Sequence, residues 1–99
     1  LPGINVWGPA YRVRDIPADD TLNVRSGPST QRTVLFELPP DASEILVIEG
    51  GCLPEVDTIT WEEADQNARL ALLNDRWCNI DWQGRTGWAF GRYLAPIQR

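Results

Sequence analysis

Histidine, lysine and methionine are absent from this 99-residue chain. Without histidine, neither a Ser-His-Asp nor a Cys-His nucleophile pair can form, and the commonest transition-metal ligand is lost. Without lysine, all nine basic residues are arginine, and 14 acidic residues bring the net charge to −5. A surface of this charge repels phosphate backbones and anionic lipid, so we do not expect nucleic acid as a partner.

Long apolar runs are also missing. No stretch reaches the roughly 18 apolar residues that a membrane-spanning helix needs, so we expect no membrane insertion. The acidic runs at Asp15 to Asp20 and Glu62 to Asp65 are typical of solvated loops and helix N-termini rather than of catalytic carboxylates. The first run lacks the ligand spacing of an EF-hand loop. We therefore expect no enzyme activity, no cofactor and no metal site.

Cysteine occurs only twice, at Cys52 and Cys78. An even count in a small, aromatic-rich chain favours a disulfide and an oxidising location, the periplasm or the exterior of the cell. The alternative is two separate buried thiols that act as small hydrophobes. If joined, the pair closes a loop of about 25 residues, which stabilises the fold by roughly 3 to 4 kcal/mol in the chain-entropy model.

Short strand-like segments dominate the first half of the chain, whose length suits one domain. Residues 1–10 carry two prolines and two glycines and are expected to form an irregular arm, with Trp7 as a candidate anchor. The last predicted strand, a continuous apolar run, is expected to end at Gly50 and Gly51. The spacing of the predicted strands is typical of a small β-barrel. The predicted strands are 11–14, 22–25, 33–38 and 44–49.

The pattern then changes to a helical one, and we predict a single amphipathic helix over residues 61–73. Apolar side chains recur there at helical spacing, at Trp61, Ala64, Ala68 and Ala71 or Leu72. Thr60 is the expected N-cap, with Glu63 completing a capping box and Asn74 as the stop. Because the helix lies between the two cysteines, a disulfide would hold the two ends of this helical segment together and attach them to the barrel.

A hairpin is predicted around Gln83 and Gly84, because glycine at the second loop position supplies the positive φ that a tight turn needs. A two-residue loop fixes which residues face each other across residues 77–82 and 85–90. One face then pairs Trp77 with Phe90, Asn79 with Trp88 and Asp81 with Thr86. The other face pairs Cys78 with Ala89 and Ile80 with Gly87. The second face is small and apolar and is predicted to be core, so the aromatic face turns outward.

Two interpretations of the aromatic face stay open. A contiguous exposed aromatic patch is an interaction site in most small proteins. Alternatively, Trp61 with its helix, or Trp7 with the arm, covers the patch and makes a second small core. A three-residue hairpin loop would also shift the register by one and separate Trp77 from Phe90.

The order of motifs resembles the bacterial Src-homology-3 family. LNVRSGPST at 22–30, ELPP at 37–40 and RWCNIDWQGRTGWAFGRYL at 76–94 carry the resemblance, which covers about residues 11–50 and 76–96. It implies a mainly β, SH3-like, partly open barrel of about five to six strands over residues 11–96. The chain departs from the family in its long insertion, residues 53–75, in Arg76 where glycine is usual, and in Phe90 with Gly91 where small residues are usual.

The resemblance further implies a module that binds rather than catalyses. By position, Trp77 matches the tryptophan of the binding groove, Phe90 follows the core position of the next strand, and Tyr93 matches the tyrosine of the closing short helix. Tyr11 is a further candidate for this groove, with a weaker match to the family pattern. A similar cysteine pair in periplasmic relatives supports the bridge between Cys52 and Cys78.

We therefore expect a periplasmic or secreted module, an adaptor or accessory subunit, that binds a peptide or protein through an aromatic groove. The groove residues are Trp77, Trp88, Phe90 and Tyr93, with Tyr11. One alternative is a cell-wall targeting module that binds peptidoglycan, which the net acidity disfavours because wall polymers are largely anionic. Another is an inhibitor of a periplasmic enzyme that uses the inserted helix.

Overall fold

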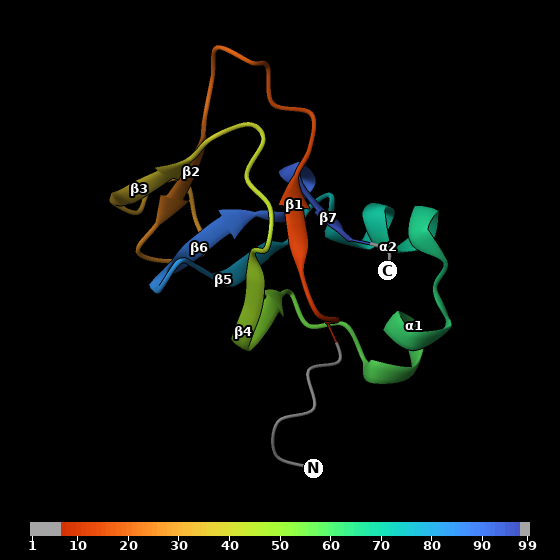
Figure 1. Cartoon of the computed structure of the whole chain (residues 1–99). Coiled ribbons are helices and arrows are strands. Elements are labelled where there is room, and N and C mark those ends of the chain that lie inside the picture. Colours follow the sequence, from red (N-terminus) through yellow and green to blue (C-terminus); the bar gives the residue numbers. More distant parts are fainter. Residues whose placement is uncertain (1–6, 98–99) are drawn as a thin grey trace.

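The structure is a computed structural model that describes residues 7–97. It consists of two antiparallel sheets and a helical segment that leaves the larger sheet after β4 and returns to it at β5 (Figure 1). We call this segment the helical excursion. The larger sheet has the order β3-β2-β6-β5-β4, and the smaller pairs β1 with β7. The mainly β class is confirmed, and neither sheet closes on itself within the described residues. The elements are β1 (Tyr11–Val13), β2 (Leu22–Arg25), β3 (Val34–Leu38), β4 (Leu46–Leu53), α1 (Thr58–Glu63), α2 (Gln66–Leu73), β5 (Trp77–Trp82), β6 (Arg85–Phe90), the 3-10 helix η1 (Gly91–Tyr93) and β7 (Leu94–Pro96).

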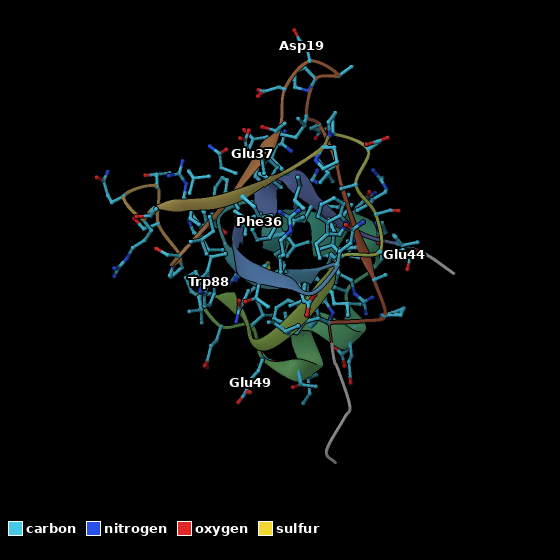
Figure 2. The ribbon with its side chains drawn as sticks, turned by 60° about the vertical axis from the view of Figure 1, so that its left-hand side comes forward. Asp19, Phe36, Glu37, Glu44, Glu49 and Trp88 are labelled. Atoms are coloured by element: carbon cyan, nitrogen blue, oxygen red, sulfur yellow. A yellow bond between two sulfur atoms is a disulfide. The ribbon has the colours of Figure 1, made fainter. Side chains whose placement is uncertain are left out.

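The core draws alternate residues from both sheets. Along β2, Leu22 and Val24 are buried whereas the residues between and after them are half-buried, as the two-residue period of a strand requires. A bridge between Tyr11 and Ile45 connects β1 to the start of β4. The long loop between β1 and β2 projects away from this core, with Asp19 at its tip (Figure 2).

The N-terminal arm is described only from Trp7 onward, and residues 1–6 of the predicted arm lie outside the described residues. Trp7 does anchor on the body. Its ring lies 4.5 Å from that of Trp61, centroid to centroid, and so close over Gly51 that a side chain there would collide with the indole. Glycine at position 51 therefore leaves room for the tryptophan.

The prediction that Gly50 and Gly51 end a strand is wrong. β4 runs through both glycines to Leu53, and the pairing with β5 shifts between Val47 and Cys52. Both glycines have positive φ, 97° and 59°, which marks a bulge that bends the strand. The strand is not continuously buried either, because Leu46 keeps 43% of its surface exposed.

The bulge brings Cys52 directly opposite Cys78, and the predicted disulfide between them is present. Both residues are buried in the main core, 1% and 0% exposed. The bridge joins positions 26 residues apart, on either side of the helical excursion. It therefore ties together the two strands from which the excursion leaves and to which it returns.

The excursion contains two helices rather than the predicted single helix over 61–73. α1 is capped by Asp57, whose carboxylate accepts from the Thr60 backbone N–H at 2.8 Å, so Thr60 is not the N-cap. The chain becomes extended at Ala64, and the Asp65 carboxylate caps α2 by accepting from the Ala68 N–H. Two aspartates at cap positions thus start two short helices. The stop at Asn74 is confirmed.

Hydrogen bonds fix α2 to the closing strand. Arg14 donates to the Leu94 carbonyl at 3.0 Å and to the Asn74 side-chain oxygen at 2.9 Å, which links β7 to the end of α2. Gln66 donates to the Pro96 carbonyl at 3.1 Å, and the Gly91 N–H donates to the Arg76 carbonyl at 2.7 Å. The helices are therefore part of the folded body.

Candidate functional site

The β5–β6 hairpin has the predicted register. Trp77 pairs with Phe90, Cys78 with Ala89 and Asn79 with Trp88. The loop is the expected two residues, and Gln83 and Gly84 both have positive φ, 55° and 84°. This combination is the turn that matches strand twist in tight hairpins. The turn is held by the Asp81 carboxylate, which accepts from the Gly84 N–H at 3.0 Å.

Three aromatic rings form a continuous row on one face of this hairpin. The Trp77 and Phe90 ring centroids are 5.1 Å apart, and those of Phe90 and Tyr93 are 6.2 Å apart with nearly edge-on geometry. Both separations lie in the range of favourable aromatic pairs. We call Trp77, Phe90 and Tyr93 the aromatic row. It spans β5, β6 and η1.

Trp77 and Phe90 lie on the sheet face opposite the core, and Tyr93 follows on η1. Cys78 and Ala89, the neighbours of Trp77 and Phe90 along their strands, are fully buried, and side chains alternate between faces. All three rings of the row are half-buried. Tyr93 also packs against the edge of the core. The row is therefore held against the fold, and each of its residues keeps part of its surface exposed.

Trp88 shares this face, two residues before Phe90, but is placed differently. Its cross-strand neighbours are Asn79 on β5 and Arg25 on β2. The far end of its indole lies over the β4 bulge, 3.8 Å from where a side chain at Gly50 would begin. Asn79 donates to the Glu49 carbonyl at 2.9 Å and so holds the bulge beside it. Trp88 therefore lies on the same sheet face as Trp77 and Phe90, with the end of its indole at the β4 bulge.

Tyr11, which the resemblance added to the site, is fully buried. Its strand alternates buried and exposed residues, and this alternation turns Tyr11 inward. Its hydroxyl donates to the Trp7 carbonyl, and burial raises the pKa of that hydroxyl, so it stays protonated. Tyr11 is part of the core and contributes no ring to the aromatic row.

Trp61 and Trp7, the tryptophans that were considered as a cover for this face, pack on each other and against the main core. Trp61 is 1% exposed, and the Arg69 guanidinium lies 5.1 Å from its ring. The two side chains are thus used to attach α1 and the arm to the body.

Arg76, which departs from the family pattern, has a structural role. Its guanidinium donates to the Pro54 carbonyl at 2.7 Å and to the Leu72 carbonyl. It therefore connects the two ends of the helical excursion immediately before Trp77. An arginine suits this position because one guanidinium can serve several carbonyls at once.

The helices carry a groove of about 570 Å³ that the sequence did not reveal. The residues that line it include Ala64, Ala68 and Leu72, together with Glu63 and Asp75. The alanine spacing was interpreted as a buried helix face, but Ala68 and Ala71 are exposed. The signal that could have revealed this groove is the small size of these residues, which leaves a hollow between bulkier neighbours.

Several acidic residues outside the groove have structural partners. Asp15 pairs with Arg92 at 2.8 Å, and this hydrogen bond lowers the pKa of the Asp15 carboxyl. Asp20 accepts from the Thr21 N–H at 2.7 Å. Within residues 7–97, no group of three or more acidic or cysteine side chains is arranged to hold a metal ion. In the same range, no helix has the length and apolar character to cross a membrane.

Because comparison with known proteins finds no match, the function has to be inferred from this geometry. No protein-family model matches the chain, and no curated protein or solved structure is significantly similar to it. The candidate binding surface therefore has three parts: the aromatic row, Trp88 on the same face, and the groove on the helices, which Arg76 helps to line.

Proposed function

We propose that this chain is a non-enzymatic peptide- or protein-binding module, an adaptor or accessory subunit, and that it holds its partner on the aromatic row. The observation that carries the proposal is the contiguity of three rings: those of Trp77 and Phe90, on the sheet face away from the core, and that of Tyr93, next to Phe90 on η1. Half-exposed aromatic rings are poorly hydrated and rigid, so covering them with an apolar segment is favourable and costs little side-chain entropy.

The partner that fits best is an extended peptide segment with apolar or proline residues. The aromatic row is a surface strip rather than a closed cavity. Aromatic surfaces of this kind bind extended peptides, whose side chains pack between the rings. The net charge of −5 favours a basic partner, because charge complementarity speeds encounter and selects among partners.

We further propose that the two sheets form an SH3-like, partly open barrel. Three features support this: the pairing of β1 with β7, the bridge from Tyr11 to Ile45, and a 3-10 helix directly before the last strand. They agree with the motif order of the bacterial Src-homology-3 family. The buried disulfide supports an oxidising location, the periplasm or the exterior.

The test is affinity capture from a bacterial periplasmic extract, with purified peptidoglycan sacculi as a parallel bait. The immobilised baits are the wild-type protein, Trp77→Ala, and the control Leu35→Ala, which removes an exposed apolar side chain from edge strand β3. We expect a protein retained by the wild type and the control and lost from Trp77→Ala. Retention by sacculi instead would favour the cell-wall alternative, and equal retention by all three baits would contradict a site on the row.

A second candidate function, inhibition of a periplasmic enzyme, is favoured by the groove on α1 and α2. The groove is lined mainly by the insertion, residues 53–75, where the chain departs from the family pattern. A substitution that fills it, Ala68→Glu, distinguishes the two functions. It should leave binding to the aromatic row intact and abolish any inhibition that depends on the helices.

A further inference from the structure

The outer edge of β3 is an unpaired edge of the larger sheet. β3 comes last in the strand order, and among residues 7–97 it pairs with β2 alone. Figure 1 shows it at the left margin of the molecule, on the side away from α1 and α2. An edge strand presents backbone N–H and C=O groups that can pair with a further strand. Because the aromatic row lies on other elements, an inference about this edge does not depend on the proposed function.

The edge carries apolar surface that the fold does not bury. Val34 and Leu35 keep 40% and 52% of their surface exposed, and they are two of the four large apolar residues exposed within the described range. Leu35 has no partner on β2, because the register shifts at this point. Proteins protect such edges with lysine, proline or a bulge. β3 contains no lysine or proline, and at its bulge the apolar side chain stays exposed.

The two ends of this edge carry opposite charge. Residues 22–36 contain two arginines, Arg25 and Arg32, and no acidic residue. Arg32 is exposed and forms no salt bridge with another described residue. At the other end Glu37 is exposed, and Asp41 follows on the loop to β4. A second β3 that runs in the opposite direction therefore brings its acidic end to the basic end of the first.

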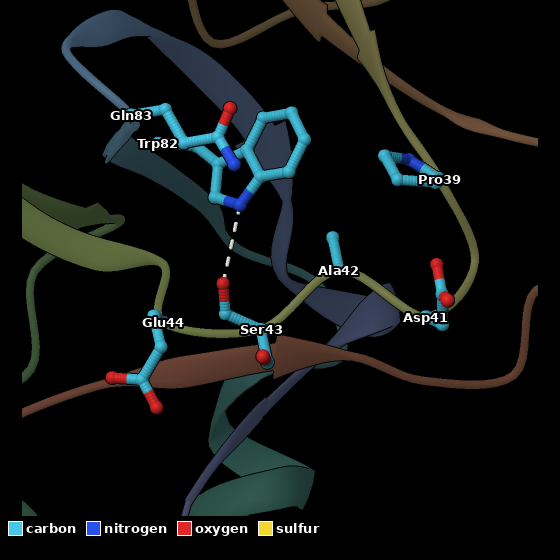
Figure 3. A pocket seen from close by; sticks show the side chains of 7 residues that line it. All are labelled: Pro39, Asp41, Ala42, Ser43, Glu44, Trp82 and Gln83. Carbon is cyan, nitrogen blue, oxygen red and sulfur yellow. Dashed lines mark hydrogen bonds between the residues drawn. The ribbon is translucent and has the colours of Figure 1, made fainter.

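Both ends of the edge are held in place by hydrogen bonds. At the basic end, the Arg25 guanidinium donates to the Thr30 carbonyl at 3.1 Å and to the Arg32 carbonyl at 3.0 Å. Beyond the acidic end, the Trp82 indole N–H donates to the Ser43 carbonyl at 3.1 Å and fixes the loop that follows β3 (Figure 3). A preformed edge loses little conformational freedom when another strand pairs with it.

We propose that β3 is a self-association site, at which two copies of this chain pair their β3 strands antiparallel about a two-fold axis. Such a contact uses the same surface on both copies, so the surface must complement itself. This edge does. With the pairing centred near Leu35, the exposed apolar side chains of the two copies cover each other. Arg32 then lies beside the partner's Glu37, and the symmetry forms this ion pair twice.

The strength of the contact follows from its size and charge. β3 is five residues long, so the interface is small and the dimer is weak. The net charge of −5 opposes association of two copies at low salt. At about 0.15 M salt the screening length is about 8 Å, so this long-range repulsion is suppressed while adjacent ion pairs are retained.

The test uses the oxidised wild-type protein at about 0.15 M salt. Sedimentation equilibrium from about 10 µM to about 1 mM protein should show a monomer–dimer equilibrium, with dimer dominant at the upper end. Proton–nitrogen NMR over the same concentrations locates the contact. The amide signals of Val34, Leu35 and Glu37 should move with concentration, whereas those of Trp77 and Phe90 should not.

Charge reversal tests the orientation of the pairing. Arg32→Glu or Glu37→Arg alone should weaken self-association at least about tenfold, because two ion pairs, each worth up to about fivefold, become repulsive. An equal mixture of the two variants should form dimers again, since each glutamate then meets an arginine. Both variants keep a net negative charge, so overall attraction does not explain this rescue. The matched control is Arg12→Glu, an exposed position on β1, which should associate like the wild type.

The proposal is overturned by a wild type that stays monomeric at about 1 mM, by single variants that associate like the wild type, or by a mixture that associates no better than either variant. Concentration-dependent shifts centred on Trp77 would overturn it too. The altered residues are exposed, so thermal melts should match the wild type and are recorded alongside. Trp77→Ala should self-associate normally, so the edge and the aromatic row can each fail while the other stands.

Discussion

At the scale of single residues, the outward position of Trp77 decides how the domain is interpreted. Its neighbour Cys78 is fully buried, so the strand period places the indole on the solvent side, where it meets Phe90. Trp61 illustrates the opposite case. It is 1% exposed and packs against Trp7, so it belongs to the core.

Trp77→Ala should therefore weaken partner binding by about 30-fold or more while the protein stays folded, because truncation of a central tryptophan in an interface costs about 2 kcal/mol or more. The free energy of unfolding should fall much less than for Trp61→Ala, because Trp77 is half-buried whereas Trp61 is 1% exposed. Binding and thermal melts are measured together. Trp61→Ala is the comparison and should unfold the domain; a Trp77→Ala variant that melts in the same way would show that Trp77 is core.

Gly91 tests how tightly the insertion is attached to the barrel. A side chain at this position would begin 2.5 Å from the Leu73 carbonyl oxygen and 3.0 Å from that of Arg76. Both neighbours are backbone, so they cannot move aside without shifting the end of α2. Gly91→Ala should lower the free energy of unfolding by about 2 kcal/mol, the usual cost of overpacking.

The matched control is Gly27→Ala, whose new side chain would lie nearest to the flexible side chain of Arg32, an exposed residue. Chemical denaturation measures both variants. A Gly91→Ala protein as stable as Gly27→Ala would mean that α2 is not held against η1 in the way described.

At the scale of elements, the hairpin was predictable and the insertion was not. Gln83 and Gly84 determine a two-residue turn, and the turn fixes the register of twelve strand residues, from Trp77 to Trp82 and from Arg85 to Phe90, because each position has one partner. The helices lack such a constraint. Asp57, Thr60 and Asp65 are all acceptable caps, and which of them starts a helix depends on how the excursion docks on the body.

The course of β4 was likewise not predictable from the sequence alone. A Gly-Gly pair is a stop signal in a sequence, yet here the strand continues because Cys52 must reach Cys78 and the bulge provides the bend. The aromatic row was predictable for the same reason as the hairpin. The exclusion of Tyr11 from it was not, because its direction depends on how β1 pairs with β7 and with Ile45.

The Asp57 cap predicts a pH dependence of α1. The hydrogen bonds from the Thr60 hydroxyl and backbone N–H lower the pKa of the Asp57 carboxyl below its ordinary 3.8. A carboxyl whose pKa is lower in the folded state contributes stability above 3.8, and this stability is lost as the pH falls through the folded pKa. Amide exchange of Thr60 and Trp61 should therefore accelerate below about pH 3.8.

Asp57→Asn keeps the cap but removes the titration, so its α1 amides should show no acceleration in that range beyond the intrinsic effect of acid. Asp15 also has a lowered pKa, but it titrates in both proteins and does not affect the comparison. Equal acceleration in wild type and variant would rule out the cap as its cause.

At the scale of the whole molecule, the disulfide spans the insertion and joins the edge strand β4 to its neighbour β5 in the larger sheet. Reduction opens a loop of 26 residues in the unfolded chain. In the chain-entropy model this lowers stability by roughly 3 to 4 kcal/mol. For a domain of this size the melting temperature should fall by at least about 10 °C.

Differential scanning calorimetry with and without reductant measures this shift. The double variant Cys52→Ala, Cys78→Ala is the control: it should melt near the reduced wild type and should not respond to reductant. A wild type that melts at the same temperature in both conditions would mean that the bridge contributes nothing to stability.

The central claim is that the outer face of β5, β6 and η1 binds the partner. Its most direct test is to select peptides from a random phage-displayed library on the oxidised protein and map their contacts by proton–nitrogen NMR. We predict that the largest shifts fall on the Trp77 indole N–H and the amides of Phe90 and Tyr93, and that Trp77→Ala abolishes them. Shifts centred on α1 and α2 or on Trp82, with the Trp77 signal unmoved, would contradict the claim.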